Sequence, residues 1–197
     1  DFLAPESNQF LLQSSLESQE KFEASRILSK EKNWGIDYSH RDSLSLMQPL
    51  NEMLFFLLKG KIHDLKDQLI ERFGCKFHSW DEEFLFHTNV LNDKHFFSPH
   101  CDNEPNDPDS RETATFVYFY SKVPQQFTGG ELCIWDTYFD SETNEIKEQL
   151  CRECLEIQPI NNRAVMFHGD CLHEVLPVKC PSQDFADSRF SITIRII

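Results

Sequence analysis

The chain has 197 residues, a hydrophobic content of 40% and a formal net charge of −14. This length suits one well-buried domain, and the apolar content indicates a globular rather than a disordered protein. The acidic excess argues against a nucleic-acid-binding surface and against docking on anionic membranes, and it favours a basic or zwitterionic substrate.

The number of cysteines and the lengths of the apolar runs indicate where in the cell the protein is expected. The seven cysteines form no regular framework, which favours a reducing compartment, and we expect a cytoplasmic protein. The longest apolar run, "MLFFLLKG" from Met53, is too short to span a bilayer. The chain begins "DFLAPE" without Met, so we expect its start to be truncated.

The first part of the chain, residues 1–75, is predicted to be a helical support. One helix is expected after Pro5, because Pro followed by Glu is typical of a helix N-terminus. A second is expected from about Pro49 to Phe73, where apolar residues recur every three or four positions. The polar segment between these helices predicts a loop that leads into a short strand.

From residue 76 the pattern changes to short aromatic and β-branched runs separated by turn-rich pieces. Many short strands at this spacing predict a β-sandwich or a small barrel. We therefore expect one mainly β (α+β) domain over residues 1–197. Its β core would occupy residues 76–197, with the N-terminal helices packed on one sheet.

The pattern His-x-Asp occurs three times, at residues 40–42, 100–102 and 168–170. On a strand the His and the Asp point to the same face and can supply two ligands to a first-row metal. A pair hydrogen-bonded at a strand end is the alternative. Only His100 and Asp102 follow a strong strand signal and precede enough chain to complete a sheet, in which His173 is well placed as a third ligand.

The last strand carries a second polar pair. Arg189 and Ser191 share one face, where a guanidinium and a hydroxyl suit a buried carboxylate. An exposed arginine beside a serine at the edge of the core is the alternative. The opposite face of this strand is apolar, so an inward-facing Arg189 would require an anionic partner.

Four motifs in order carry a resemblance to a known family: His-x-Asp, Gly-Gly-Glu-Leu at 129–132, His-Glu-Val-x-Pro-Val at 173–178, and Arg-x-Ser. This order resembles the Fe(II)- and 2-oxoglutarate-dependent dioxygenases, most closely their prolyl 4-hydroxylase-like branch, over about residues 84–197. Two features depart from the family pattern. The loop before Arg189 is longer, and a tyrosine that contacts 2-oxoglutarate has no counterpart at residues 88–91.

The resemblance implies a double-stranded β-helix (jelly roll) and a set of site residues. It implies that His100, Asp102 and His173 bind iron. It also implies that Arg189 binds the distal carboxylate of 2-oxoglutarate, with Ser191 and Thr115 as further co-substrate or pocket contacts.

The activity implied by the resemblance is hydroxylation of an unactivated C–H bond of a peptidyl residue, coupled to decarboxylation of 2-oxoglutarate to succinate. Fe(II), 2-oxoglutarate and O2 would be required, with ascorbate as a reductant. The expected partner is a peptide or a small molecule, with no nucleic acid and no membrane. Three alternatives stay open: the same chemistry on a free amino acid or metabolite, a cupin-like metal-binding protein, and a catalytically silent jelly roll.

Overall fold

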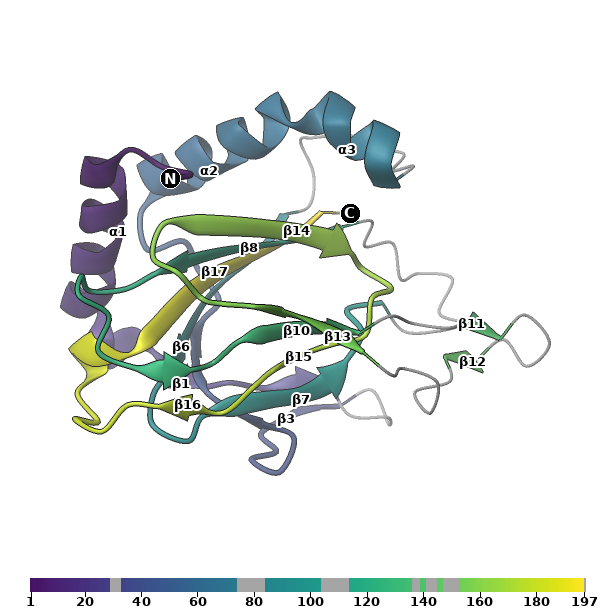
Figure 1. Cartoon of the computed structure of the whole chain (residues 1–197). Helices are drawn as coiled ribbons and strands as arrows, with labels where there is room; N and C mark the ends of the chain where they lie inside the picture. Colours follow the sequence, from purple (N-terminus) through teal and green to yellow (C-terminus); the bar gives the residue numbers. More distant parts are fainter. Residues whose placement is uncertain are drawn as a thin grey trace.

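The structure, a computed structural model, describes residues 1–28, 33–73, 84–103, 114–135, 139–140, 145–146 and 153–196. Two antiparallel sheets form its centre, and helices cover the outer face of the larger sheet (Figure 1). Among the helices in these ranges, none is long and apolar enough to cross a membrane.

The larger sheet has six strands in the order β1-β5-β6-β17-β8-β14. Neighbours in the sheet are mostly distant in sequence, as a jelly roll requires. The strands are β1 (Glu23–Ala24), β5 (Leu44–Leu46), β6 (Phe84–Leu91), β17 (Arg189–Ile196), β8 (Ala114–Tyr120) and β14 (Arg163–His168).

The smaller sheet has five strands in the order β13-β10-β15-β7-β4 and lies across from the larger one (Figure 1). They are β13 (Cys154–Ile157), β10 (Leu132–Trp135), β15 (His173–Val175), β7 (Phe96–His100) and β4 (Arg41–Asp42). Three two-stranded ladders complete the β structure: β2 (Ile27–Leu28) with β3 (Trp34–Gly35), β9 (Thr128–Gly129) with β16 (Val178–Lys179), and β11 (Phe139–Asp140) with β12 (Glu145–Ile146).

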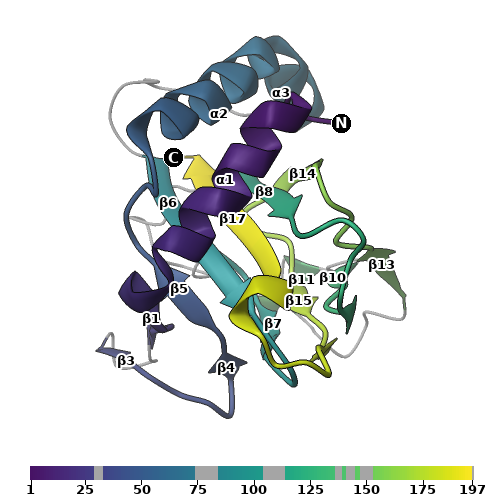
Figure 2. The same ribbon diagram turned by 90° about the vertical axis from the view of Figure 1, so that its left-hand side faces the viewer.

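The helices are α1 (Pro5–Glu17), α2 (Glu52–Asp64) and α3 (Lys66–Phe73), with short 3₁₀ turns at Gln19–Lys21 and Phe185–Asp187. Figure 2 shows α1 crossing the strands of the larger sheet and α2 running above it. Leu11, Leu58 and Ile62 from these helices pack on the sheet in one buried cluster. Each fully buried aliphatic side chain contributes about 1.5–3 kcal/mol to the stability of this layer.

Along each central strand, side chains point alternately toward this helical layer and into the space between the two sheets. On β17, Phe190, Ile192 and Ile194 belong to the cluster under the helices. Arg189 and Ser191 therefore point to the opposite face, between the sheets. The same parity holds on β6 and β8, so the odd-numbered positions of all three strands face inward.

Two predictions about the N-terminal part need correction. The single helix expected from Pro49 to Phe73 is divided at Leu65, whose N–H bonds Ile62 O three residues back, at 3.0 Å. Such a tight turn interrupts the α-helical hydrogen-bond ladder. The segment before it is also more than a helical support, because β1 and β5 extend the larger sheet and β4 extends the smaller one. The predicted helical packing on one sheet is confirmed.

Candidate active site

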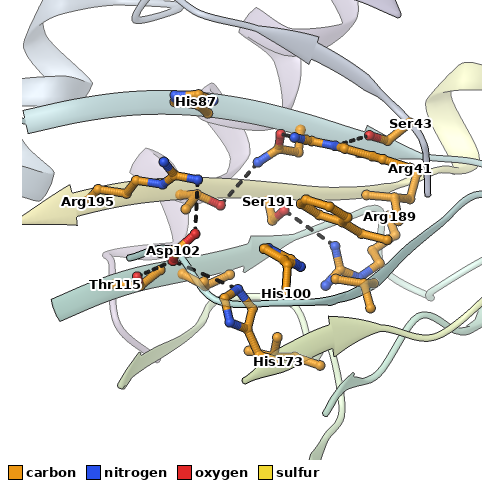
Figure 3. Close-up of a pocket in the computed structure, with 17 residues that line it drawn as sticks. Arg41, Ser43, His87, His100, Asp102, Thr115, His173, Arg189, Ser191 and Arg195 are labelled. Carbon is orange, nitrogen blue, oxygen red and sulfur yellow. Dashed lines mark hydrogen bonds and ion pairs between the residues drawn. The ribbon is translucent and has the colours of Figure 1, made fainter. Parts of the chain in front are cut away.

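The inward-facing residues of the two sheets line a cavity (Figure 3). The larger sheet contributes positions 87, 89 and 91 of β6, 115 and 117 of β8, and 189, 191, 193 and 195 of β17. The smaller sheet contributes residues at the ends of β7 and β15, and β4 adds Arg41 at its edge. Every residue that the sequence analysis singled out for the site lies here: His100, Asp102, Thr115, His173, Arg189 and Ser191.

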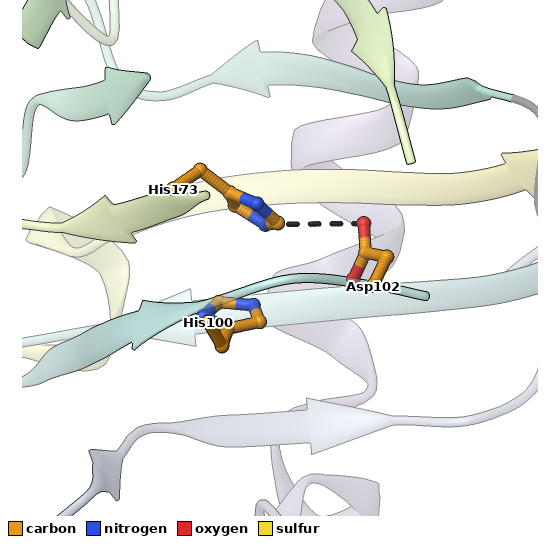
Figure 4. A group of neighbouring side chains, drawn as sticks. All are labelled: His100, Asp102 and His173. Atoms are coloured by element: carbon orange, nitrogen blue, oxygen red, sulfur yellow. Dashed lines mark ion pairs between the residues drawn. The ribbon is translucent and has the colours of Figure 1, made fainter. Parts of the chain in front are cut away.

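Three of these residues converge on one point (Figure 4). His100 ends β7 and His173 begins β15, and the two are direct partners across the antiparallel pair. Asp102 follows β7 by two residues, and its Oδ2 lies 3.8 Å from His173 Nε2. One donor atom from each residue lies within 4.8 Å of the others, so the group can hold a metal ion. Two imidazoles and a carboxylate suit a first-row metal and leave coordination positions open.

Hydrogen bonds orient both imidazoles for this purpose. His100 Nδ1 lies 2.9 Å from Ser98 O, and His173 Nδ1 lies 2.9 Å from Cys171 O. Because a carbonyl oxygen only accepts, each Nδ1 carries the proton and each Nε2 keeps its lone pair. This arrangement is typical of metal-binding histidines.

Charge and burial keep the three groups in the protonation state that a metal needs. Burial opposes ionisation of Asp102, but Arg195, the two histidines and the Thr115 hydroxyl together hold the pKa of its carboxyl below the ordinary value. Burial lowers the pKa of His100 well below its ordinary value and also lowers the pKa of His173. At neutral pH the site therefore presents a carboxylate and two neutral imidazoles, the forms that bind metal ions.

Two side chains outside the His100, Asp102 and His173 group contact the Asp102 carboxylate. The Thr115 hydroxyl donates a hydrogen bond to Asp102 Oδ2, and Arg195 Nη2 lies 2.9 Å from Asp102 Oδ1. Thr115 and Arg195 are themselves partners across β8 and β17. Sequence reasoning missed Arg195, although continuing the alternation from Arg189 along the same strand would have found it.

We expect Thr115→Val to lower the metal affinity about 10–100-fold, the usual cost of losing a hydrogen bond to a metal ligand. Valine keeps the size of this buried residue but cannot donate to Asp102. Titration with Mn(II) followed by calorimetry would measure the change. Thr115→Ser retains the hydroxyl and should bind metal as the wild type does; equal affinity of the valine variant would contradict the support role.

Arg189 also lines the cavity and is 2% exposed. Its Nε donates to Gly130 O at 2.8 Å, its Nη1 lies 3.4 Å from Ser191 Oγ, and its guanidinium carbon lies 5.0 Å from the centre of the Phe119 ring. Burial lowers its pKa to about 10, and Glu131 opposes this shift. Because its hydrogen-bond partners Gly130 O and Ser191 Oγ are neutral, the buried guanidinium can bind an anion from outside the chain.

Gly130 explains the Gly-Gly-Glu-Leu motif. Its φ of +71° favours glycine, and a Cβ at this position would approach Arg189 Cδ to 2.7 Å. The glycine therefore gives the arginine both its carbonyl partner and the room for its side chain.

The part of the cavity nearest β4 contains residues that the sequence analysis did not select. Arg41 Nε donates to Ser43 Oγ at 2.9 Å and its Nη2 donates to Asn89 Oδ1 at 2.7 Å. Asn89 in turn donates to Thr193 Oγ1 at 3.1 Å. Asn89 lies in the stretch where the family's tyrosine was not found, so an amide–guanidinium pair occupies this side of the cavity.

The other two His-x-Asp pairs do not reach the cavity. His168 ends β14, with its Nδ1 3.3 Å from Asp170 Oδ2. His40 contacts the edge of Phe97, and Asp42 lies 3.7 Å from His95 Nε2. Within the described residues neither pair gains a third metal-binding side chain. Both are hydrogen-bonding or packing pairs, as the alternative reading of the pattern proposed.

A second group with metal-ligand chemistry lies on the smaller sheet, where Cys133, Cys154 and Glu156 also have donor atoms within 4.8 Å of one another. Burial raises the pKa of the Cys133 thiol to about 12, and a hydrogen bond with Cys154 adds to this. Thiolate donors select zinc, copper(I) and iron–sulfur clusters, and the proton on the Cys133 thiol must be displaced before the sulfur can bind. The chemistry of the donors therefore favours the His100 group.

His87 also lines the cavity and provides a pH prediction. Burial, followed by the charges of Arg195 and Arg41, lowers its pKa from 6.5 to about 4, while Asp102 opposes the shift. Between these two values the unfolded chain binds a proton that the folded chain rejects. The free energy of unfolding should therefore fall as the pH decreases from 6.5 to 4, and this loss should be absent above pH 6.5.

His87→Leu should reduce that pH dependence, because it removes one group that takes up a proton on unfolding. Urea unfolding followed by circular dichroism across the same pH window measures the slope. His63→Leu, a change at an exposed position of α2, is the control. A slope as steep in His87→Leu as in the wild type would show that His87 is not responsible.

Comparison with protein families gives a match to the model described as the 2OG-Fe(II) oxygenase superfamily, over residues 86–196. An uncharacterized PKHD-type hydroxylase of Synechocystis sp. is 30% identical over 198 residues, covering 98% of this chain. The chain spans 59% of the length of that curated relative.

Solved structures share the fold at lower sequence identity. A prolyl-4-hydroxylase from Pseudomonas putida superposes with a TM-score of 0.66 at 16% identity, covering 98% of this chain and 87% of the other. A prolyl hydroxylase from Trichoplax adhaerens, in complex with a hypoxia inducible factor oxygen degradation domain peptide fragment, gives a TM-score of 0.65 at 15% identity, covering 98% and 79%. The predicted jelly-roll core is confirmed.

Proposed function

The chain belongs to the 2OG-Fe(II) oxygenase superfamily, and from this premise we propose that it is a dioxygenase that hydroxylates an unactivated C–H bond of a peptidyl residue. The observation that carries the proposal is the convergence of His100, Asp102 and His173 in one cavity with the buried Arg189. A silent jelly roll would have no need for a buried guanidinium whose hydrogen-bond partners among the described residues are all neutral.

In this proposal the chain's own residues bind and orient. His100, Asp102 and His173 hold Fe(II), and Thr115 and Arg195 keep the Asp102 carboxylate in place. With O2 and 2-oxoglutarate, the bound metal supplies oxidation in which one oxygen atom enters the substrate C–H bond while 2-oxoglutarate becomes succinate and CO2.

Arg189 and Ser191 are proposed to bind the distal carboxylate of 2-oxoglutarate. A planar guanidinium donates two parallel hydrogen bonds to a carboxylate, and the serine hydroxyl lies beside it to add a third. Buried between the sheets, this pair would also keep water away from the charged end of the co-substrate.

A peptide substrate is the finer part of the proposal. Its support is the fold shared with prolyl hydroxylases, one of which was solved with a peptide fragment. Oxidation of a free amino acid or small metabolite is the alternative. The proposal also includes one catalytic domain over residues 1–197, ascorbate as reductant and a cytoplasmic location.

The test uses the purified chain with Fe(II) under anaerobic conditions. Addition of 2-oxoglutarate should produce a visible metal-to-ligand charge-transfer band, and O2 should then give succinate in step with hydroxylated product. Prolyl peptides and free amino acids are compared as substrates. A chain that binds Fe(II) but gives no 2-oxoglutarate-dependent band would contradict the proposed function.

A further inference from the structure

Arg41 lines the cavity of the proposed active site but has no part in the proposed binding of iron or 2-oxoglutarate. Its two hydrogen-bond partners, Ser43 and Asn89, are both neutral. Its Nη1 has no partner among the described residues, and no carboxylate in that part of the chain forms an ion pair with it. The guanidinium of this cavity-lining residue thus has donors that no described residue uses.

The charges around the cavity do not balance. Its described lining holds three guanidinium groups, those of Arg41, Arg189 and Arg195, against one carboxylate, that of Asp102. With neutral histidines this is an excess of two positive charges. Fe(II) and the 2-oxoglutarate dianion would cancel each other, so the loaded site would keep the same excess.

Two of the three arginines already have an anion in the proposed function. Arg195 lies 2.9 Å from Asp102 Oδ1, and Arg189 would bind the distal carboxylate of 2-oxoglutarate. Arg41 is the one left over. Its half-buried position makes an uncompensated charge costly, and an incoming anion would remove that cost.

The position of Arg41 fits a group that lies close to the reacting bond. Its guanidinium carbon lies 4.5 Å from the centre of the Phe97 ring, and the same ring stacks on His100 with a centre-to-centre distance of 3.6 Å. The Phe97 ring therefore contacts both groups. Through this shared contact Arg41 lies near the proposed metal ligand, on the β4 side of the cavity (Figure 3).

We propose that Arg41 binds a carboxylate of the substrate that is hydroxylated, so that the enzyme acts on carboxylic acids. This inference rests on the proposed function and names its substrate class. The carboxylate can belong to a free amino acid, to the last residue of a peptide or to an acidic side chain next to the reacting residue. A two-pronged contact with the guanidinium would fix the neighbouring C–H bond relative to the metal centre.

The substrate charge that suits the cavity is opposite to the one expected from the net charge of the whole chain. The net charge of −14 favours a basic or zwitterionic substrate, whereas the cavity itself has the opposite sign. A local field within a cavity acts on the bound group more strongly than distant surface charges, which salt screens.

The experiment compares acids with their neutral counterparts in the anaerobic Fe(II)–2-oxoglutarate complex. The probes are the N-acetyl-L-amino acids and their primary amides, free L-amino acids, and peptides with the residue at an internal position, at the C-terminus or before Asp. Binding is followed by the change in the charge-transfer band, and product formation is then measured with O2. The acid of at least one pair should bind at least about 10-fold more tightly than its amide, as expected for hydrogen bonds to a charged group.

Variants test whether Arg41 causes the preference for the acid over its amide. Arg41→Met should bind acid and amide equally, while Arg41→Lys should keep part of the preference because the positive charge remains. Arg163→Met, on β14 away from the cavity lining, is the matched control and should discriminate as the wild type does. The peptide and free amino acid probes identify which source of the carboxylate is used.

The inference is overturned if the wild type binds acids and amides equally, if no acid in the panel changes the band, or if Arg41→Met keeps the acid preference. Each of these outcomes leaves the iron–2-oxoglutarate band in place, and thus leaves the proposed function standing. Loss of the band itself would instead refute the proposed function and this inference with it.

Discussion

Replacing His173 with alanine should abolish 2-oxoglutarate turnover and metal binding together. His173 contributes one of the three donor groups, and its Nε2 is held toward the centre by the bond from Nδ1 to Cys171 O. Loss of an outer hydrogen bond to such a site costs roughly 10–100-fold, so loss of a ligand itself should exceed this. Succinate release and calorimetric titration with Mn(II) measure the two effects, and Asp102→Ala should behave in the same way.

The chain supplies its own control for this result. His168 belongs to an identical His-x-Asp pair but ends β14 outside the cavity. His168→Ala should keep both turnover and metal affinity within about twofold of the wild type, as a surface change does. If His168→Ala lost turnover while His173→Ala retained it, the ligand assignment would be wrong.

Replacing Arg189 with methionine should weaken 2-oxoglutarate binding by about 2–5 kcal/mol, which corresponds to a rise in KM of roughly 30-fold or more. Methionine fills a similar space but offers no donor to the distal carboxylate. The same change should leave the free energy of unfolding unchanged or raise it. The hydrogen-bond partners of the buried Arg189 charge, Gly130 O and Ser191 Oγ, are neutral, so removing the charge relieves its burial cost and offsets the loss of these two bonds.

These opposite effects separate a binding role from a structural one. Steady-state kinetics with varied 2-oxoglutarate and urea unfolding of the same samples give both quantities. Arg189→Lys keeps a charge but cannot donate two parallel hydrogen bonds, so its KM should fall between those of the other two proteins. A methionine variant that loses stability but keeps its KM would show that Arg189 serves the fold alone.

Much of the fold could be predicted because strand periodicity is a local property. The runs around β6, β7, β8, β14 and β17 alternate or are continuously apolar, and each appears as a strand close to its expected bounds. The helix over residues 49–73 was predicted too long, since an apolar spacing of three and four residues does not report a tight turn such as that at Leu65.

Some residues of the site could be predicted from the sequence and others could not, and the difference has a physical reason. Arg195 shares the inward face of β17 with Arg189, so the two-residue period alone was enough to include it. Arg41 carried no comparable signal. It lies in a polar segment between two helices, and it reaches the cavity only because β4 pairs with β7, which places Arg41 opposite Phe97.

The sequence by itself determined which residues share a face of each strand, and it determined the ordered motifs that indicate the superfamily. Only the tertiary structure decided which of three identical His-x-Asp pairs meets a third ligand, because that meeting depends on the pairing of β7 with β15. It also decided the sign of the charge inside the cavity. Composition sums all charged groups, whereas folding selects the few that face inward, and among the described residues of the cavity lining these are three arginines and one aspartate.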